Sequence, residues 1–209
     1  TGTSVTHGGY YQLDNVTLGF NPSGSNVRTD CVDPTSPPPA VPGAPDGPNL
    51  LTNGNFGTGA LAPWAMAFEP NITGQVTNGV FQFIKTSGVA PGGVILQATG
   101  AATVANEFLT ATFDLGNTSA LRKRVTAIVH DNDFSDLTAC TFWLPPGLPL
   151  STFQVRMRAT EAWTNATLSI YPATTGLEQW IQLDNASLKR TPGATMAGTE
   201  CLEPVEVVQ

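Results

Sequence analysis

Residues 180–204 read WIQLDNASLKRTPGATMAGTECLEP, and residues 10–34 read YYQLDNVTLGFNPSGSNVRTDCVDP. The two stretches align without a gap at an offset of 170 positions, and 9 of their 25 positions are identical. They share a Gln-Leu-Asp-Asn block, two prolines and a cysteine. Short apolar strands rarely keep such features in register by chance, so we interpret the pair as two copies from a tandem repeat.

The offset also divides the chain into segments. Residues 1–34 are predicted to be the closing strand and tail of a preceding repeat, and residues 49–204 one complete domain. Residues 35–48 form a proline-rich linker, with seven prolines between positions 33 and 48, which favours an extended, semi-rigid spacer. Residues 205–209 would begin the next linker. Because the sequence opens without an initiator methionine or a signal peptide, we expect a processed product or a segment of a longer chain.

The composition excludes several classes of partner. Only 12% of the residues are charged, and the net charge is −7. This balance argues against nucleic acid and against an anionic membrane surface. No apolar run approaches the roughly 18 residues that a membrane span requires, so no membrane insertion is expected.

Short strands dominate the pattern of the chain after position 49. Many segments alternate apolar and polar residues, as residues 153–157 do, and Gly, Pro, Asn and Asp separate them. No segment keeps a helical period over three turns. The predicted strands are 50–56, 65–69, 80–85, 94–98, 108–115, 125–130, 138–144, 153–158, 166–171 and 180–188. About ten short strands at this spacing predict an all-β sandwich.

The two ends of the domain carry a resemblance. The opening Asn-Leu-Leu-Thr-Asn-Gly-Asn-Phe of residues 49–56, the Pro-Trp at 63–64 and the strands at 166–170 and 181–188 look like the terminal signatures of the galactose-binding-like jelly rolls. That superfamily includes the carbohydrate-binding modules of xylanases and glucanases. The resemblance implies an all-β jelly-roll β-sandwich whose first and last strands lie side by side, preceded here by an N-terminal strand and a proline-rich linker.

The cysteine count is odd, and the repeat accounts for it. Cys140 and Cys201 belong to one unit, so we predict a disulfide between them. Cys31 would have its partner before the first residue, and it is expected to be free or bonded to another chain. Such a disulfide indicates an oxidising, extracellular location. The alternative is that the thiols are buried and free.

Two places could bind a structural calcium. The resemblance implies a site near the joined ends, where Asp184 matches the closing-strand aspartate. Gly57 stands where an acidic residue is expected, so the remaining oxygens would come from Asn53, Asn55 and backbone carbonyls; otherwise Asp184 and Asn185 cap a turn.

The second place is the run His-Asp-Asn-Asp-Phe-Ser-Asp at 130–136. Asp131 and Asp133 could act as alternating calcium ligands, although the glycine and the distant glutamate of an EF-hand are missing. The alternative is a polar loop that joins two strands. His130 is expected to be a satisfied strand residue rather than a ligand.

Sugar binding needs an exposed aromatic face beside hydrogen-bonding groups. Trp163, with Glu161 beside it, is the best candidate because it lies in a turn-like stretch. Trp143 is expected to be packed. No nucleophile elbow, histidine-rich metal motif or phosphate loop is present, so an enzyme is not expected. Sequons for N-glycosylation begin at Asn15, Asn71, Asn117, Asn165 and Asn185.

Two functions remain open from the sequence. The first is a non-enzymatic extracellular structural repeat of a filament, stalk or surface coat, in which the domain contacts copies of itself. Its leading strand, with Tyr10, Tyr11, Leu13 and Leu18, would either be the stump of a preceding repeat or add to a neighbouring sheet. The second is a carbohydrate-binding module that docks a polysaccharide.

Overall fold

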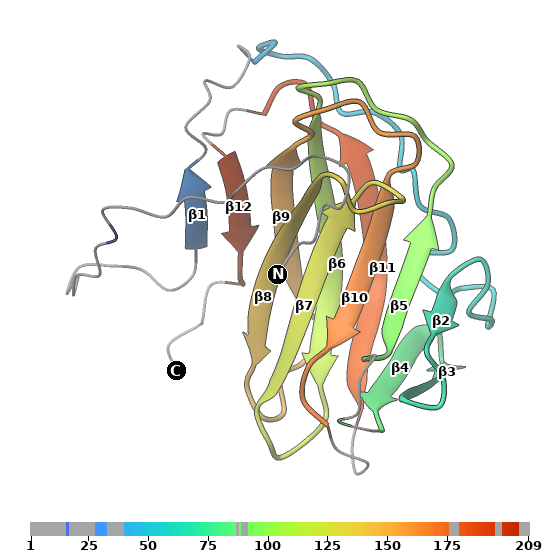
Figure 1. The fold of residues 1–209 in the computed structure, drawn as a ribbon. Helices are drawn as coiled ribbons and strands as arrows, with labels where there is room; N and C mark the ends of the chain where they lie inside the picture. Colours follow the sequence, from blue (N-terminus) through green and yellow to red (C-terminus); the bar gives the residue numbers. More distant parts are fainter. Residues whose placement is uncertain are drawn as a thin grey trace.

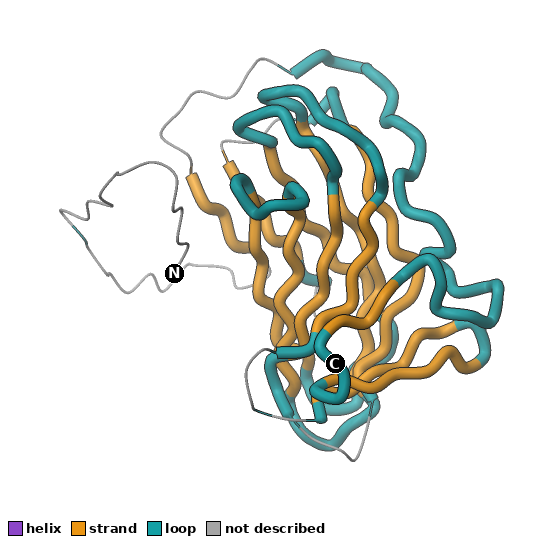
Figure 2. Tube along the Cα trace, turned by 45° about the vertical axis from the view of Figure 1, so that its right-hand side comes forward, coloured by secondary structure: helices purple, strands orange, loops and turns teal. Residues whose placement is uncertain are grey.

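The computed structural model describes Val16, the backbone of residues 28–32, and residues 40–86, 88, 92–175, 180–194 and 198–204. Within these residues, twelve β-strands form two sheets that pack face to face (Figure 1). The two layers of strands, and the loops that join them at both ends, are also clear in Figure 2. The all-β sandwich predicted from the sequence is confirmed.

The described strands pair with antiparallel neighbours throughout the two sheets. The seven-stranded sheet contains, in spatial order, β1 (Arg28–Val32), β12 (Gly198–Leu202), β9 (Ser151–Arg158), β6 (Phe108–Asn117), β11 (Ile181–Arg190), β4 (Val80–Lys85) and β3 (Ile72–Thr77). The five-stranded sheet contains β2 (Ala65–Ala67), β5 (Val94–Ala98), β10 (Thr167–Pro172), β7 (Lys123–His130) and β8 (Leu137–Leu144).

The core lies between the two sheets because their strands alternate in polarity. In β8, exposed and buried residues alternate at every position, as expected for a strand with one face in the core and one in solvent. Aromatic rings from both sheets meet there: Phe142 of β8 lies 5.0 Å from Phe153 of β9 and 6.1 Å from Phe113 of β6 between ring centroids. Burial of these large rings is a main source of stability.

The ends of the domain lie side by side, as the resemblance implied. The backbone N–H of Leu50 donates to the carbonyl of Leu188 at 2.8 Å, and that of Ala186 donates to the carbonyl of Gly54 at 2.9 Å. The predicted strand at 50–56 is nevertheless wrong, because this segment turns repeatedly: Asn53 and Phe56 have φ values of 50° and 47°. Glycine is required at position 54, where a Cβ would lie 2.0 Å from the Ala186 carbonyl oxygen.

The second half of the predicted spacer is part of the domain surface. The N–H of Val41 donates to the Pro192 carbonyl at 3.0 Å, and the N–H of Gly47 donates to the Arg190 carbonyl at 2.8 Å. Residues 41–47 are therefore held against the end of β11 rather than standing away from it. The prolines remove donors, but the donors between them remain available for these contacts.

A disulfide joins the two sheets. Cys140 in β8 is bonded to Cys201 in β12, and their Cα atoms lie 5.6 Å apart. The predicted disulfide is confirmed, and Cys31, the third of the three cysteines in the sequence, has no further cysteine in the chain to pair with. Strands β1, β3 and β12 do not appear among the predicted strands. In the structure β1 and β3 form the two edges of the larger sheet, and β12 lies between β1 and β9.

The predicted strand at 10–18, including Tyr10, Tyr11, Leu13 and Leu18, lies outside the described residues except for Val16. Within the part of the chain that the structure describes, we find no helix long and apolar enough for a membrane crossing.

Candidate functional site

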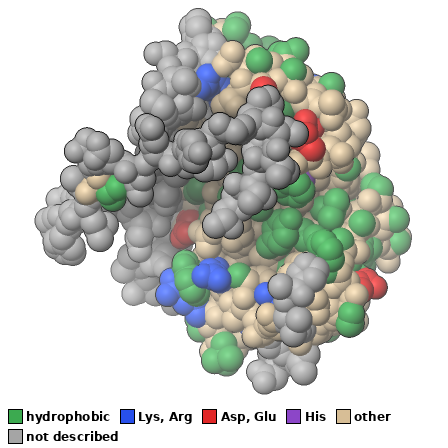
Figure 3. Space-filling model, in the orientation of Figure 1, with side chains coloured by type: hydrophobic (Ala, Val, Ile, Leu, Met, Phe, Trp, Pro, Cys, Tyr) green, Lys and Arg blue, Asp and Glu red, His purple; other side chains and the backbone are tan. Residues whose placement is uncertain are grey.

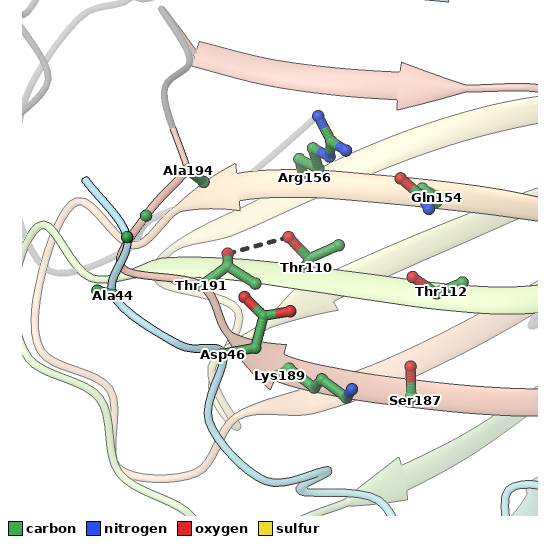
Figure 4. Close-up of a pocket in the computed structure, with 12 residues that line it drawn as sticks. Ala44, Asp46, Thr110, Thr112, Gln154, Arg156, Ser187, Lys189, Thr191 and Ala194 are labelled. Carbon is green, nitrogen blue, oxygen red and sulfur yellow. Dashed lines mark hydrogen bonds between the residues drawn. The ribbon is translucent and has the colours of Figure 1, made fainter. Parts of the chain in front are cut away.

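A hollow of about 670 Å³ lies on the outer face of the seven-stranded sheet. Its floor is made by three neighbouring strands, β9, β6 and β11, whose outward side chains point into it (Figure 4). Alternate residues of a strand share a face, so each strand supplies residues two positions apart. The floor and one wall are formed by Thr110, Thr112, Gln154, Arg156, Ser187, Lys189 and Thr191.

The wall at one end comes from the segment that the sequence assigned to the spacer. Gly43, Ala44 and Asp46 face Gly193 and Ala194 across this end of the hollow. The contact is close, because a Cβ on Gly193 would lie 3.2 Å from the Ala44 carbonyl oxygen. Docking of the proline-rich segment therefore shapes the hollow, which local sequence patterns alone do not predict.

The chemistry of the hollow is that of hydrogen bonding. Its lining offers hydroxyl groups, one amide and charges of both signs. Thr110 and Thr191 share a hydrogen bond between hydroxyls at 3.0 Å, and Arg156 lies 3.4 Å from the Glu200 carboxylate. Among the described residues, no hydrogen bond or ion pair engages the Lys189 ammonium group. Hydroxyl and amide groups can both donate and accept hydrogen bonds, so the floor can match a polar ligand at several points.

An acidic pair lies on the same outer face. Asp114 of β6 and Asp184 of β11 are register partners. Asp114 accepts hydrogen bonds from the Thr152 hydroxyl at 2.6 Å and from the Asn185 amide at 2.9 Å. Burial raises the pKa of Asp184, and the nearby charge of Asp114 acts in the same direction, while the hydrogen bond from the Asn185 N–H opposes it.

The residues named for the first predicted calcium site have hydrogen-bond partners within their own segments. Asn53 is used within its own loop: its amide nitrogen donates to the carbonyls of Ala60 and Ala62 at 2.8 and 2.9 Å, and its oxygen accepts from the Thr58 hydroxyl at 3.1 Å. Asp184 instead accepts the Asn185 N–H at 2.7 Å. Across the described residues, no group of three or more His, Cys, Asp or Glu side chains could hold a metal ion.

The second predicted calcium site is a structural loop. Asp131 is buried, and its carboxylate accepts the N–H groups of Thr164 and Asn165 at 3.1 and 3.0 Å. Asp133 accepts the N–H of Ser135 at 2.9 Å, and hydrogen bonds from Ser135 hold the pKa of Asp133 below its usual value. These carboxylates serve to order two loops, which agrees with the alternative of a polar loop between strands.

His130 is a satisfied strand residue, as predicted. Its Nδ1 lies 2.5 Å from the Asp131 carbonyl oxygen, and its Nε2 lies 2.8 Å from the Ser169 hydroxyl. The ring stacks on Phe134 at 3.9 Å between centroids. Burial lowers its pKa, and the Asp131 carbonyl and carboxylate only partly oppose this.

The expectation that Trp163 is exposed is wrong. Only 2% of Trp163 is accessible, and its indole N–H donates to the Asp136 carboxylate at 2.9 Å. Such an acceptor stabilises a buried indole, but an acceptor 27 positions away along the chain cannot be assigned from sequence. Glu161 is exposed next to it, and without an exposed ring it does not form the predicted sugar platform.

Trp143, expected to be packed, is the exposed tryptophan instead. Its exposure is 42%, and the guanidinium carbons of Arg122 and Arg124 lie 4.3 and 5.5 Å from the ring centroid. It belongs to the outer face of the five-stranded sheet, where hydrophobic side chains gather over the central strands (Figure 3). Trp143 therefore lies on the opposite outer face of the sandwich from the hollow.

Comparison with known proteins identifies the fold. No family model and no curated protein matches the chain. The xylan-binding domain CBM22-1 of Xyn10C from Paenibacillus barcinonensis superposes with a TM-score of 0.53 and 13% identity, over 72% of this chain and 99% of that domain. The fold is the jelly roll of carbohydrate-binding modules.

Two further modules superpose over similar lengths. TmCBM61, solved with β-1,4-galactotriose, has a TM-score of 0.48 and 12% identity over 69% of this chain and 99% of its own. A CBM4 module has a TM-score of 0.48 and 15% identity over 66% of this chain and 98% of its own. Both superpositions include nearly the whole of the other module.

The jelly roll also limits which sequons could carry a glycan. Asn117 is fully buried, and its amide donates to the carbonyls of Leu121, Leu144 and Pro145 at 2.9, 3.1 and 2.9 Å. It is therefore excluded as a glycan acceptor in the folded domain. Asn71, Asn165 and Asn185 are at least partly exposed and stay candidates, whereas Asn15 lies outside the described residues.

Proposed function

We propose that this domain is an extracellular, non-catalytic carbohydrate-binding module that holds a neutral polysaccharide in the hollow across β9, β6 and β11. One observation carries the proposal: three adjacent strands aim polar side chains into an open depression of about 670 Å³. Polysaccharides present hydroxyl groups at regular intervals, and a row of Thr, Ser and Gln side chains supplies matching donors and acceptors.

The geometry suits an extended ligand. Neighbouring strands lie about 4.8 Å apart, and alternate residues on one strand lie about 6.7 Å apart, so the floor is a grid of hydrogen-bonding groups. Each hydrogen bond contributes only about 0.5–1.5 kcal/mol net. Useful affinity therefore requires several contacts at once, which a long sugar chain lying over Thr112, Gln154 and Ser187 can make.

The ligand is proposed to be uncharged for an electrostatic reason. Asp46, Arg156 and Lys189 give the lining charges of both signs, while the whole chain carries a net charge of −7. That net charge repels a polyanion at long range. Neutral polysaccharides of the xylan type meet no such barrier.

Of the two functions predicted from the sequence, the module is the better supported. The structure with the higher TM-score among those described above is a xylan-binding domain, and the Cys140–Cys201 disulfide is typical of secreted proteins. The filament role and the absence of catalysis stay predictions.

Binding is tested by isothermal titration with soluble xylan, mixed-linkage glucan and galactan. The double variant T112A/Q154A should weaken binding about tenfold or more, because it removes two hydrogen-bonding side chains from the floor. The matched control is T126A/T141A, which removes a hydroxyl pair joined at 2.9 Å on the outer face of the other sheet. The proposal fails if no glycan binds the parent chain or if the control loses affinity equally.

A further inference from the structure

The outer edge of the seven-stranded sheet is formed by two strands from opposite ends of the sequence. β1 lies antiparallel to β12 (Figure 1). In the register, Asp30 is opposite Glu200, Thr29 is opposite Cys201, and Cys31 is opposite Thr199. On its other side β12 pairs with β9, so both edges of β12 are satisfied within the described part of the chain.

This register has an internal symmetry. At the offset of 170, Asp30 is the sequence counterpart of Glu200, Thr29 of Thr199, and Cys31 of Cys201. The counterparts at the centre, Asp30 and Glu200, therefore face each other. On either side of them, Thr29 faces the counterpart of Cys31, and Cys31 faces the counterpart of Thr29. That is the arrangement of an isologous pair, in which two copies of one strand are related by a local two-fold axis.

β12 is well suited to present such an edge. Cys201 is bonded to Cys140 in the opposite sheet, and the Thr199 and Thr138 hydroxyls lie 3.1 Å apart. These links, with the pairing to β9, fix the position of a strand of only five residues. When β1 is absent from its outer side, such a fixed strand offers N–H and C=O groups that another strand can pair with.

We propose that the outer edge of β12 is a docking site for the tail strand of another copy of this domain, in an antiparallel register centred on position 200. β1, which has the sequence of such a tail strand, occupies the site in this chain. The inference goes beyond carbohydrate binding and does not depend on it. Two domains joined in this way would share one continuous sheet.

Charge is balanced in the proposed pair. Arg156 of β9 is the register partner of Glu200 and lies 3.4 Å from its carboxylate. When two copies of β12 pair at position 200, their glutamates meet, but each already has its own arginine on the far side. The resulting row of four side chains has no net charge, so the like charges at its centre are compensated.

A single substitution tests the register by using the native Cys31. T199C places a second cysteine at the position opposite Cys31, and cross-strand partners lie within the range of a disulfide. Peptide mapping under non-reducing conditions should find Cys31 linked to the thiol introduced at position 199 in T199C, and no link from Cys31 in the control L202C. A link within one chain or between two chains supports the site; its absence in T199C, or an equal yield in L202C, overturns the proposal.

A second variant tests whether the edge accepts another copy. D30P removes a backbone donor from the centre of β1 and disfavours its pairing, which uncovers β12. Light scattering after size exclusion should then give twice the 21.9 kDa of the chain. The control V16P changes a residue that is 68% exposed and should leave the mass of the parent. Because β1 is the edge strand of its sheet, circular dichroism should show D30P folded; a D30P monomer at every concentration overturns the proposal.

Discussion

The two outer faces of the sandwich both arise from the alternation of side chains along the strands, but they differ in shape and chemistry. On the seven-stranded sheet, Thr112, Gln154 and Ser187 face an open hollow. On the five-stranded sheet, hydrophobic side chains lie among polar ones (Figure 3), and Arg122 and Arg124 lie over the ring of Trp143. The first face combines polar side chains with a depression that can receive a hydroxylated ligand. On the second face, the Thr126 and Thr141 hydroxyls are hydrogen-bonded to each other at 2.9 Å.

The carboxylates show the same contrast. Asp131 and Asp136, at one end of the five-stranded sheet, are consumed by hydrogen bonds to neighbouring loops. Asp114 of β6 also accepts two hydrogen bonds, but it is less buried than Asp131, and Asp46 in the docked segment is exposed. Burial therefore distinguishes the carboxylates of the two sides better than the number of their partners.

The largest expected effect on stability comes from removing the disulfide that joins the two sheets. The double variant C140A/C201A removes a cross-link that spans 61 positions, and a loop of that length predicts a loss of about 4 kcal/mol in the free energy of unfolding. Urea denaturation measures it. C31A, which removes the remaining cysteine, should match the parent chain, and a loss below about 1 kcal/mol in the double variant would show that packing alone holds the sheets together.

The next largest effect on stability is expected from a comparison of the buried carboxylate of Asp131 with the partly exposed carboxylate of Asp114. D131A should lower the free energy of unfolding by about 3 kcal/mol, because it leaves buried N–H groups without an acceptor. D114A, on the hollow side, should cost about 1 kcal/mol or less because water can replace its partners. Thermal and urea unfolding of both variants provide the measurement, and equal losses would remove the distinction between the two faces.

The stability of the domain should depend on pH through His130, which lies in β7 of the five-stranded sheet. Burial lowers the pKa of His130 in the folded state from its ordinary 6.5, so the unfolded chain binds more protons as the pH falls below that value. Stability should therefore decrease from about pH 7.5 to about pH 5. H130Q should remove this part of the slope, whereas H7Q, at the other histidine of the sequence, should keep it. A slope unchanged in H130Q would contradict the assignment.

The smallest effect is expected at Trp143. W143A removes the stacking with Arg122 and Arg124 and should cost about 0.5–1 kcal/mol of stability. Its affinity for polysaccharide should stay within about twofold of the parent, because the ligand is expected on the other face. Titration with the same glycans measures this, and a complete loss of binding would move the site to the five-stranded sheet.

Much of the fold could be predicted from local pattern, and less of the site. Period-two alternation located β8 and β9, and the repeat alone was enough to pair Cys140 with Cys201. The segment at 50–56 was predicted as a strand, yet the positive φ values of Asn53 and Phe56 make it turn instead. The wall near Asp46 was predicted to be part of a spacer. Sequence could not show that this segment bonds to Pro192, because the two segments are far apart in the chain and meet only in the folded structure.

Residue order is enough to specify an all-β sandwich with a repeated tail and one internal disulfide, because alternation and residue spacing are local properties. Which side chains remain free to act is settled only by the folded arrangement. Trp163 is buried in the hydrophobic core, with its indole N–H bonded to Asp136 across 27 positions. The floor of the hollow exists because β9, β6 and β11 are neighbours. Whether a side chain can bind a ligand depends on contacts with residues that are distant in the chain. Those contacts form only when the two sheets pack around one core.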